Sequence, residues 1–393
     1  MDLLLVTVVG IIALALLFDF SNGFHDAANS VATVVATRAL PPKWAVWFSA
    51  AFNFAVYFFV GTAVANTVAK TVASGHESIA VVFSSLVAAI AWNYFTWWVG
   101  MPSSSSHAII GGLVGAGLSA GGLDAVNWSS VEKTAIAIVV SPAVAFTISF
   151  LAMFLVAALQ WSTGWHDNAK PFKALQLVSA GAVSFGHGAN DAQKTMGLIA
   201  ALLVGAGYLH PHAGSTAVVV PEWVALSAYT AIALGTVWGG WKIIETMGLR
   251  ITLLHASSGV AANVGATAAI FGATAVGVPV STTHAAASSV IGAGVSSGRG
   301  ANWRVVTEMV VAWVTTIPAA MGLSFVVYRL TQLPTAGAWV AVGSVLFVLG
   351  GAITYAMRHA VKADDVVAEI PAEEVLEEHQ PVHPHLEGHG AID

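Results

Sequence analysis

The sequence of 393 residues contains no cysteine, and only 9% of its residues are charged. Without cysteine there are no disulfides, zinc–thiolate sites or cysteine nucleophiles. An ordinary soluble domain has about 25% charged residues, so the shortage of charge argues against a soluble protein. The sequence also lacks a His-Glu-x-x-His motif and a nucleophile with a positioned base, so we expect no enzyme activity.

Long apolar runs take the place of the missing charge. Hydrophobic residues make up 57% of the chain and the mean hydropathy is +0.78. The runs 44–66, 78–99 and 337–357 are nearly free of charge. Each has about the 20 residues that a helix needs to cross roughly 30 Å of hydrocarbon. The sequence therefore predicts an all-α polytopic membrane protein with about ten to twelve membrane segments, embedded in a lipid bilayer and with no nucleic-acid partner.

Two apolar stretches are too long for a single span. Residues 3–37 and 174–207 would each form a helix of roughly 50 Å, and each carries a polar cluster near its middle. Non-helical backbone at membrane depth is tolerated only where protein or a water-filled cavity surrounds it. We therefore expect both helices to be broken at these clusters.

Two motifs recur in the same order, which indicates an internal repeat. The cluster NGFHDAANS (22–30) matches HGANDAQKT (187–195), and MPSSSSH (101–107) matches the VPVSTTH segment (278–284). Interrupted apolar segments at corresponding positions are typical of secondary transporters. We predict a first transmembrane repeat at 1–160, a short loop at 161–173, a second repeat at 174–331, an appended membrane helix at 332–358 and a disordered acidic tail at 359–393. The tail contains four histidines, for which we weigh a metal site against a merely solvated tail: His379, His383, His385 and His389.

The two serine- and threonine-rich segments are candidate anion sites. Proline followed by hydroxyl residues favours the start of a helix, where free N–H groups and a partial positive charge bind phosphate-like anions. A single serine in a membrane helix usually only contacts a neighbouring helix, but the duplication favours a site. The candidate residues for the anion are Ser104, Ser105, Ser106, Ser281, Thr282 and Thr283.

Asp26 and Asp191 occupy equivalent places in the two polar clusters. A carboxylate at the bilayer centre costs on the order of 3 kcal/mol and marks an ion path or a proton relay. Two carboxylates repel an anion unless a cation binds with it, which indicates symport. Oxygen ligands of this kind suit Na⁺ or a divalent metal held by Asp26 and Asp191.

The residues around the two aspartates differ between the halves. Asn22 and Asn29 accompany Asp26, whereas Lys194 stands where Asn29 has its match, so an ammonium takes the place that a free cation would occupy. His25 stands where the second half has Asn190. Imidazole titrates near neutral pH, so four histidines are candidate proton carriers: His25, His107, His187 and His284.

The motifs NGFHDAANS, GHGANDAQKTMG and the paired P-x-S-[ST]-[ST]-H segments resemble the PiT family of inorganic phosphate transporters over residues 1–331. The resemblance implies an inverted-repeat fold with broken helices and two re-entrant hairpins. It places a cation and phosphate site at Asp26, Asn29 and Asp191, with Asn22, His25 and Asn190 in the same motifs. It implies phosphate at Ser104–Ser106 and at Ser281–Thr283, and we expect Lys194 either to neutralise Asp191 or to contact phosphate directly.

His25 and Lys194 depart from the pattern of sodium-coupled members. They resemble a branch associated with proton-driven uptake, often of neutral metal–phosphate, in a prokaryotic inner membrane. We therefore expect a proton-coupled phosphate symporter with no cofactor, and we keep a sodium-coupled phosphate symporter or a sulfate permease as alternatives. The resemblance leaves a homodimer open.

Overall fold

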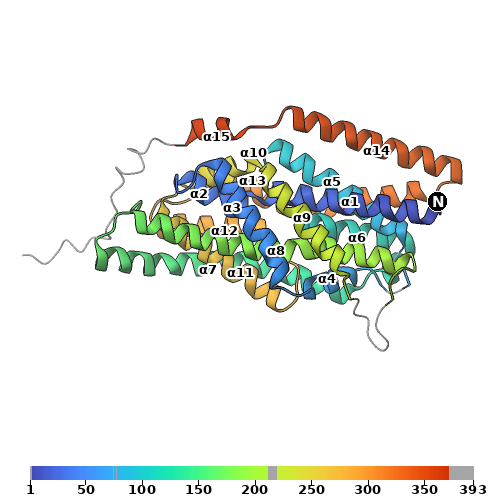
Figure 1. Cartoon of the computed structure of the whole chain (residues 1–393), viewed down its shortest axis with the longest axis horizontal. Coiled ribbons are helices and arrows are strands. Elements are labelled where there is room, and N and C mark those ends of the chain that lie inside the picture. The colour runs from blue at the N-terminus through green and yellow to red at the C-terminus, as the bar shows by residue number, and fades with distance from the viewer. Residues whose placement is uncertain (1, 74, 77, 211–218, 371–393) are drawn as a thin grey trace, which may run out of the picture.

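The computed structural model describes residues 2–73, 75–76, 78–210 and 219–370, and shows a bundle of long helices (Figure 1). The described chain contains no β-strand, only one isolated bridge between Val72 and Val126. The helices are α1 (Leu3–Asp26), α2 (Ala28–Ala36), α3 (Pro42–Ala55), α4 (Ala63–Ala69), α5 (Ile79–Val99), α6 (Ser105–Gly121), α7 (Trp128–Thr163), α8 (Lys170–Gly205), α9 (Glu222–Trp238), α10 (Trp241–Glu245), α11 (Ala256–Ala275), α12 (Thr282–Ser296), α13 (Trp303–Thr331), α14 (Thr335–Arg358) and α15 (Ala363–Glu369).

Six helical segments of the described chain are long and apolar enough to cross a membrane, or seven if one bent pair is counted. They are Leu3–Ala36, Ile79–Val99, Ser105–Ala125, Trp128–Thr163, Trp303–Thr331 and Thr335–Arg358, and the bent pair is Pro42–Phe58 with Ala63–Ala69. This number is below the predicted ten to twelve. Helices α9 and α12 have only 17 and 15 residues, and α8 carries the polar cluster. The higher number stays a prediction.

The expected breaks in the two long segments are largely absent. α8 is one helix of 36 residues that continues through the cluster at 187–195, so the prediction of a broken helix there is wrong. α1 and α2 are separated by Ala27 alone, which keeps right-handed helical angles (φ −51°, ψ −35°). The sharp bend, 88°, lies instead between α3 and α4.

Gln193, a polar side chain of the cluster on α8, is satisfied without any opening of the helix. Gln193 Oε1 accepts hydrogen bonds from the backbone N–H groups of Val64 (2.9 Å) and Ala65 (3.2 Å) at the start of α4. Its amide nitrogen donates to the carbonyl of Ala189 at 2.7 Å. A buried polar side chain with partners on other elements does not need an opened backbone. The bend between α3 and α4 thus supplies the free N–H groups that α8 uses.

Glycines bring helices from distant parts of the sequence into backbone contact. A Cβ on Gly23 of α1 would overlap the carbonyl oxygen of Ile232 on α9. A Cβ on Gly115 of α6 would overlap the backbone of α13, and one on Gly292 of α12 would overlap the backbone of α7. Small residues at helix crossings are how membrane helices approach closely. These three crossings fix the positions of α1, α6 and α12, the helices whose ends carry the repeated motifs.

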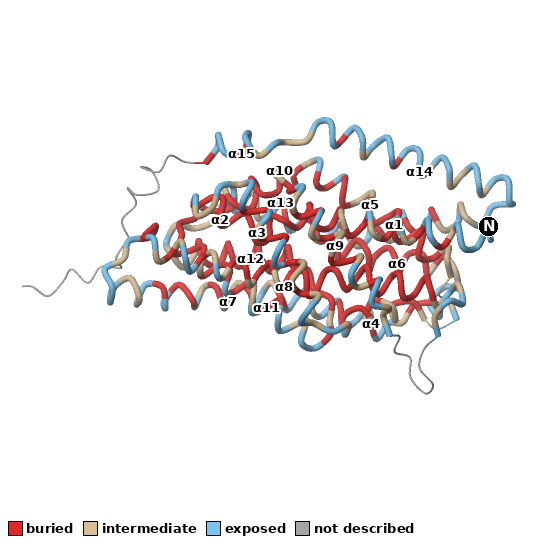
Figure 2. Tube along the Cα trace, viewed as in Figure 1, coloured by how far each residue is buried: buried red, intermediate tan, exposed pale blue. Residues whose placement is uncertain are grey.

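The buried residues concentrate in the middle of the bundle, and α14 lies along its outside (Figure 2). The most apolar stretch of α14 has none of its residues buried, as expected for a helix facing lipid. The tail beyond it differs from the prediction of disorder over 359–393, because Ala363–Glu369 is helical. Arg38 holds this part of the chain by donating to the carbonyl of Ile370 at 3.3 Å. The four tail histidines lie outside the described residues.

The loop between the two halves is shorter than predicted, because α7 and α8 extend into it and leave only 164–169. Asp167 in this loop accepts from Ser257 on α11 and from Gln160, and it pairs with Arg299. Burial alone would raise the pKa of Asp167, but the Ser257 hydroxyl, the Arg299 guanidinium and the Gln160 amide together hold it below its ordinary value. The loop is thus fastened to both ends of the α11–α12 segment.

The Gly23 crossing predicts a position-specific effect on stability. Gly23→Ala must push α1 and α9 apart, which costs roughly 1–3 kcal/mol. Gly10→Ala on the same helix meets no atom within 4 Å, and should stabilise by about 0.5–1 kcal/mol because alanine favours helix. Thermal unfolding of the detergent-purified variants measures both. Equal melting temperatures for the two variants would contradict the crossing.

Candidate functional site

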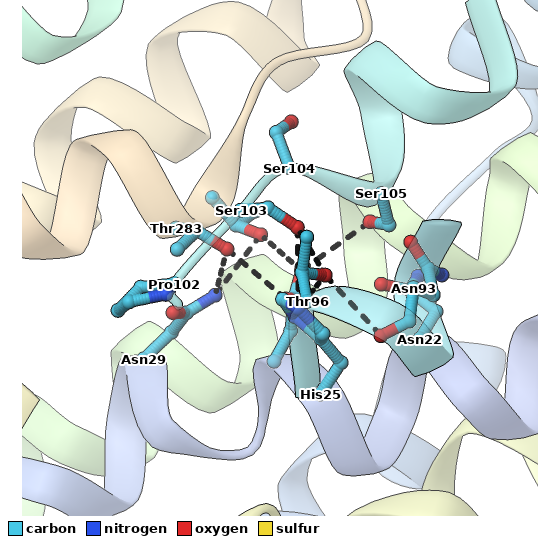
Figure 3. Close-up of polar contacts among 12 residues, drawn as sticks. Asn22, His25, Asn29, Asn93, Thr96, Pro102, Ser103, Ser104, Ser105 and Thr283 are labelled. Atoms are coloured by element: carbon cyan, nitrogen blue, oxygen red, sulfur yellow. Dashed lines mark hydrogen bonds and ion pairs between the residues drawn. The ribbon is translucent and has the colours of Figure 1, made fainter. Parts of the chain in front are cut away.

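Two helix starts from different halves of the chain meet in the middle of the bundle. Ser104 caps α6 by accepting from the backbone N–H of His107 (3.2 Å), and Ser281 caps α12 by accepting from that of His284 (3.1 Å). Figure 3 shows the Ser104 side chain turned away from the cluster of polar contacts. Both serines were predicted to bind the anion, and the structure gives both hydroxyls a capping role.

Asp26, at the end of α1, accepts hydrogen bonds from hydroxyl groups at both helix starts. Ser105 of α6 donates to Oδ2 at 3.4 Å, whereas Thr282 (3.2 Å) and Thr283 (3.0 Å) of α12 donate to Oδ2 and Oδ1. The Thr282 hydroxyl also lies 3.3 Å from Oδ2 of Asp191. Because a hydroxyl has one hydrogen, it donates to one aspartate at a time. Thr282 therefore bridges the two carboxylates that the sequence predicted to be partners.

Two asparagines connect the clusters across the halves. Asn22 donates to Asp191 Oδ2 at 3.3 Å, although the two residues belong to different repeat motifs. Asn29 donates to the hydroxyl oxygens of Thr282 (3.2 Å) and Thr283 (3.4 Å). A threonine oxygen that accepts from Asn29 keeps its own hydrogen for a carboxylate (Figure 3). Asn29 thereby orients the donors that face Asp26.

His25 links Asp26 to α5 and to the loop before α6. Its Nδ1 lies 2.8 Å from Asp26 Oδ1, and its Nε2 lies 3.2 Å from Thr96 Oγ1 and 3.3 Å from Ser103 Oγ. The two hydroxyls are 2.7 Å apart (Figure 3). A hydroxyl can donate or accept, so this chain accommodates either tautomer of the ring. Thr96 was not predicted from the sequence, since a lone threonine in an apolar helix gives no signal.

Lys194 places a positive charge at the second aspartate. Its side chain is completely buried, and its Nζ lies 2.8 Å from Oδ1 of Asp191 on the same helix. The two atoms form an ion pair by distance, although they are not aligned for a hydrogen bond. His187 Nε2 lies 3.6 Å from the other oxygen of Asp191. Asp191 is therefore neutralised by a neighbour three residues away, whereas Asp26 is held only by hydroxyls and an imidazole.

Two predicted site residues hold the turn between α11 and α12. Asn190 accepts from the N–H of Val280 (3.1 Å) and donates to Thr274 (3.0 Å) and to the carbonyl of Val278 (3.2 Å). Ser106 donates to the carbonyl of Val280 at 2.5 Å. The side chains of Asn190 and Ser106 are thus engaged with the turn rather than with the aspartates.

The histidines form two groups. His25 and His187 lie beside the carboxylates, whereas the rings of His107 and His284 contact each other with centroids 4.4 Å apart. His284 also stacks on Trp313 at 4.0 Å. The rings of this second pair lie just after the helix starts and pack against each other and Trp313, and within the described chain neither ring is hydrogen-bonded to Asp26 or Asp191.

One set of ligands in the described chain could hold a cation. Asp26, His187 and Asp191 each direct one ligand atom to a common place, with all three atoms within 4.8 Å of one another. Carboxylate oxygens and an imidazole nitrogen suit a divalent transition metal or zinc. The ammonium of Lys194 opposes such an ion, so the two charges compete for Asp191.

The whole cluster is closed off from water. None of its side chains exposes more than 3% of its surface, from Asn29 at 3% to Asp191 and Lys194 at 0%. A ligand can reach these groups only after neighbouring helices move. Asp19, a buried carboxylate on α1, was not predicted as a site residue. Its position two helical turns before Asp26 could have indicated that it lies on the same side of the helix.

The sequence model described as "Phosphate transporter family" matches residues 22–324, which include both helix starts and both aspartates. The chain belongs to this family. The resemblance found in the motifs is confirmed, and because the family and its relatives are transporters, so is the expectation that the protein is not an enzyme. It is a membrane-embedded, multi-pass protein.

Relatives of known name agree with this assignment. The chain is 46% identical to the "Probable low-affinity inorganic phosphate transporter" of Rhizobium meliloti (strain 1021), covering 83% of this chain and 96% of that protein. It is 41% identical to the protein of the same name in Bacillus subtilis (strain 168), covering 85% and 99%. The solved structure titled "The sodium-dependent phosphate transporter" is similar with a TM-score of 0.75 at 25% identity, covering 84% of this chain and 99% of that one.

The bridge through Thr282 predicts a loss of transport. Thr282→Val keeps the shape of the side chain but removes the hydroxyl shared by the two aspartates. A hydrogen bond to a charged group is worth about 1.5–3 kcal/mol, so phosphate uptake should fall at least tenfold. Thr147→Val on the exposed face of α7 is the matched control and should keep wild-type uptake. Wild-type uptake by Thr282→Val would show that the bridge is dispensable.

Proposed function

We propose that this protein carries inorganic phosphate across a prokaryotic inner membrane by symport with protons. The phosphate assignment is supported by the family and by the names of its relatives. The coupling assignment rests on one observation, the buried ammonium of Lys194 at 2.8 Å from Asp191.

Phosphate would bind between the starts of α6 and α12. The hydroxyls of Ser105, Thr282 and Thr283 now donate to carboxylates, and a phosphate oxygen can replace those acceptors. Two helix N-termini add free N–H groups and partial positive charge without a full cation. Ser104 and Ser281 would support these starts as caps, and Lys194 would contact phosphate when it leaves Asp191.

The charges at the two aspartates favour protons over sodium. In the first cluster Asn29 offers an amide, whereas the equivalent place in the second cluster holds a fixed positive charge. A fixed ammonium does the electrostatic work of a bound sodium ion but cannot travel with the substrate. The travelling charge must then bind elsewhere, and the Asp26–His25 pair, 2.8 Å apart, is able to take up a proton.

Alternating access would come from movement of two hairpins, α5 with α6 and α11 with α12. Their turns approach each other closely, as the contact of Ser106 with Val280 supports. In this arrangement the two halves, 1–160 and 174–331, form an inverted repeat around the site, as in other secondary transporters. The closed cluster corresponds to an occluded stage between the outward and inward openings.

One observation favours sodium as the coupling ion, and another favours metal-bound phosphate as the substrate. The solved neighbour is sodium-dependent by its title, so sodium coupling is the second candidate. The ligand set of Asp26, His187 and Asp191 supports carriage of a divalent metal bound to phosphate. Sulfate has the shape of phosphate but binds no proton at neutral pH, so it serves as a competitor in the test.

Uptake of labelled phosphate into proteoliposomes tests the proposal, with sodium, the pH gradient and divalent metal varied independently. We expect accumulation that a protonophore abolishes, that sodium does not change and that excess sulfate does not inhibit. Uptake that collapses only when sodium is removed would overturn the proton assignment. Stimulation by a divalent metal that enters together with phosphate would support the metal–phosphate species.

Lys194→Asn should move the dependence from protons toward sodium, because it restores the asparagine of the first cluster and removes the fixed cation. We expect uptake to be stimulated at least tenfold by sodium in this variant. Lys170→Asn, at the exposed start of the same helix, is the matched control and should behave as wild type. If Lys194→Asn shows the same uptake at every sodium concentration, the ammonium does not stand in for a cation.

A further inference from the structure

A third aspartate lies inside the bundle, outside the cluster described above. Asp19 is on α1 and is completely buried. Neither of its carboxylate oxygens has a hydrogen-bond partner within the described chain. Because seven residues make two helical turns, it lies on the same side of α1 as Asp26. A buried carboxylate without partners is costly when charged, so its presence calls for a role.

Asp19 is surrounded by other polar groups that lack partners. Its neighbours include Thr195 of α8, Asn22 of its own helix and Tyr229 of α9. Thr195 Oγ1, Asn22 Oδ1 and the Tyr229 hydroxyl also have no hydrogen-bond partner in the described chain. A protonated Asp19 could donate to any of these oxygens, and an ionised Asp19 could accept from the two hydroxyls. The surroundings therefore suit both protonation states.

The charged and titratable groups that face Asp19 are few. α8 contributes the buried side chains of Asp191, Lys194 and His187, of which Asp191 and Lys194 are near enough for their charges to affect Asp19. α9 contributes Tyr229, and α5 contributes Tyr94 as its titratable side chain. α2 contributes none, and α1 itself carries His25 and Asp26. Lys194 is thus the positive charge shared between Asp19 and Asp191.

The net charge of this region explains why a proton on Asp19 would favour phosphate binding. Asp19, Asp26 and Asp191 together with Lys194 carry a net charge of −2 when all three carboxylates are ionised. An anion entering beside this charge is repelled. One proton on Asp19 reduces this net charge from −2 to −1. Lys194 can then pair with Asp191 or contact the anion. Loss of that proton draws Lys194 toward Asp19 and weakens the hold on phosphate.

We propose that Asp19, with Thr195, Asn22 and Tyr229 around it, is a second proton-binding site in addition to the Asp26–His25 pair, that it is separate from the phosphate site, and that Lys194 couples it to that site. The inference rests on the proton-coupled phosphate transport proposed above. In each cycle the proton adds to a carboxylate oxygen of Asp19 on the side where phosphate enters. It leaves from that oxygen to water on the other side, and no electrons are transferred.

Asp19→Asn tests the site, because an amide imitates a carboxyl that is permanently protonated. Exchange of internal for external phosphate needs no release of the proton, whereas net accumulation does. In proteoliposomes we expect exchange within about threefold of wild type. Accumulation driven by a pH gradient should fall at least tenfold. Asp19→Glu should recover accumulation with a shifted pH profile.

The control is Asp124→Asn, which removes an exposed carboxylate and should match wild type in both assays. Retention of gradient-driven accumulation by Asp19→Asn overturns the inference. Loss of exchange along with accumulation in a folded variant, judged by gel filtration and thermal unfolding, also overturns it, because Asp19 would then serve phosphate binding or structure. If Asp19→Asn does not fold, an unshifted pH profile for Asp19→Glu overturns it and a shifted one supports it.

The same assays separate this inference from the proposed function. Wild-type protein that accumulates phosphate without any response to the pH gradient would remove the proton coupling itself. A wild-type response that survives in Asp19→Asn would leave proton coupling in place and remove only Asp19 from it.

Discussion

The repulsion between Asp26 and Asp191 is the constraint on which the rest of the structure depends. Their ligand atoms lie within 4.8 Å of each other in the buried interior of the bundle, where two like charges are strongly disfavoured. The neighbouring side chains reduce this repulsion. The Thr282 hydroxyl donates a hydrogen bond to one carboxylate or the other, and Lys194 neutralises Asp191. His25 contacts Asp26 directly, and Asn29 orients the threonine hydroxyls that face it. Under the proposed function, phosphate binds there only together with enough positive charge to offset the two carboxylates.

The two halves of the site are alike in backbone and unlike in charge. Ser104 and Ser281 cap their helices in the same way, and each cap is followed by a histidine. The aspartates, by contrast, differ in their counter-charges, a hydroxyl and imidazole set at Asp26 and an ammonium at Asp191. Under the proposed function, the symmetric part holds a tetrahedral anion between two helix ends. The asymmetric part then determines which charge accompanies that anion.

The sequence predicted which residues lie together around the two aspartates better than it predicted the backbone that surrounds them. Asp26, Asp191, Thr282 and Thr283 could be grouped because a duplicated motif reveals partners without any knowledge of the fold. The unbroken course of α8 could not be predicted, since it depends on Gln193 meeting Val64 and Ala65, which are far away in sequence. Asp19 has no match in the second half, so the repeat gave no reason to select it.

The glycine crossings have a consequence for how the protein can move. α6 is pressed against α13, α12 against α7 and α1 against α9, in each case by a glycine with no room for one more carbon atom. Every one of these pairs joins a helix from residues 1–160 to a helix from residues 174–331. Helices packed this closely cannot slide past each other without backbone overlap. A change of conformation that displaces one helix of a pair must therefore also displace its partner from the other half of the sequence.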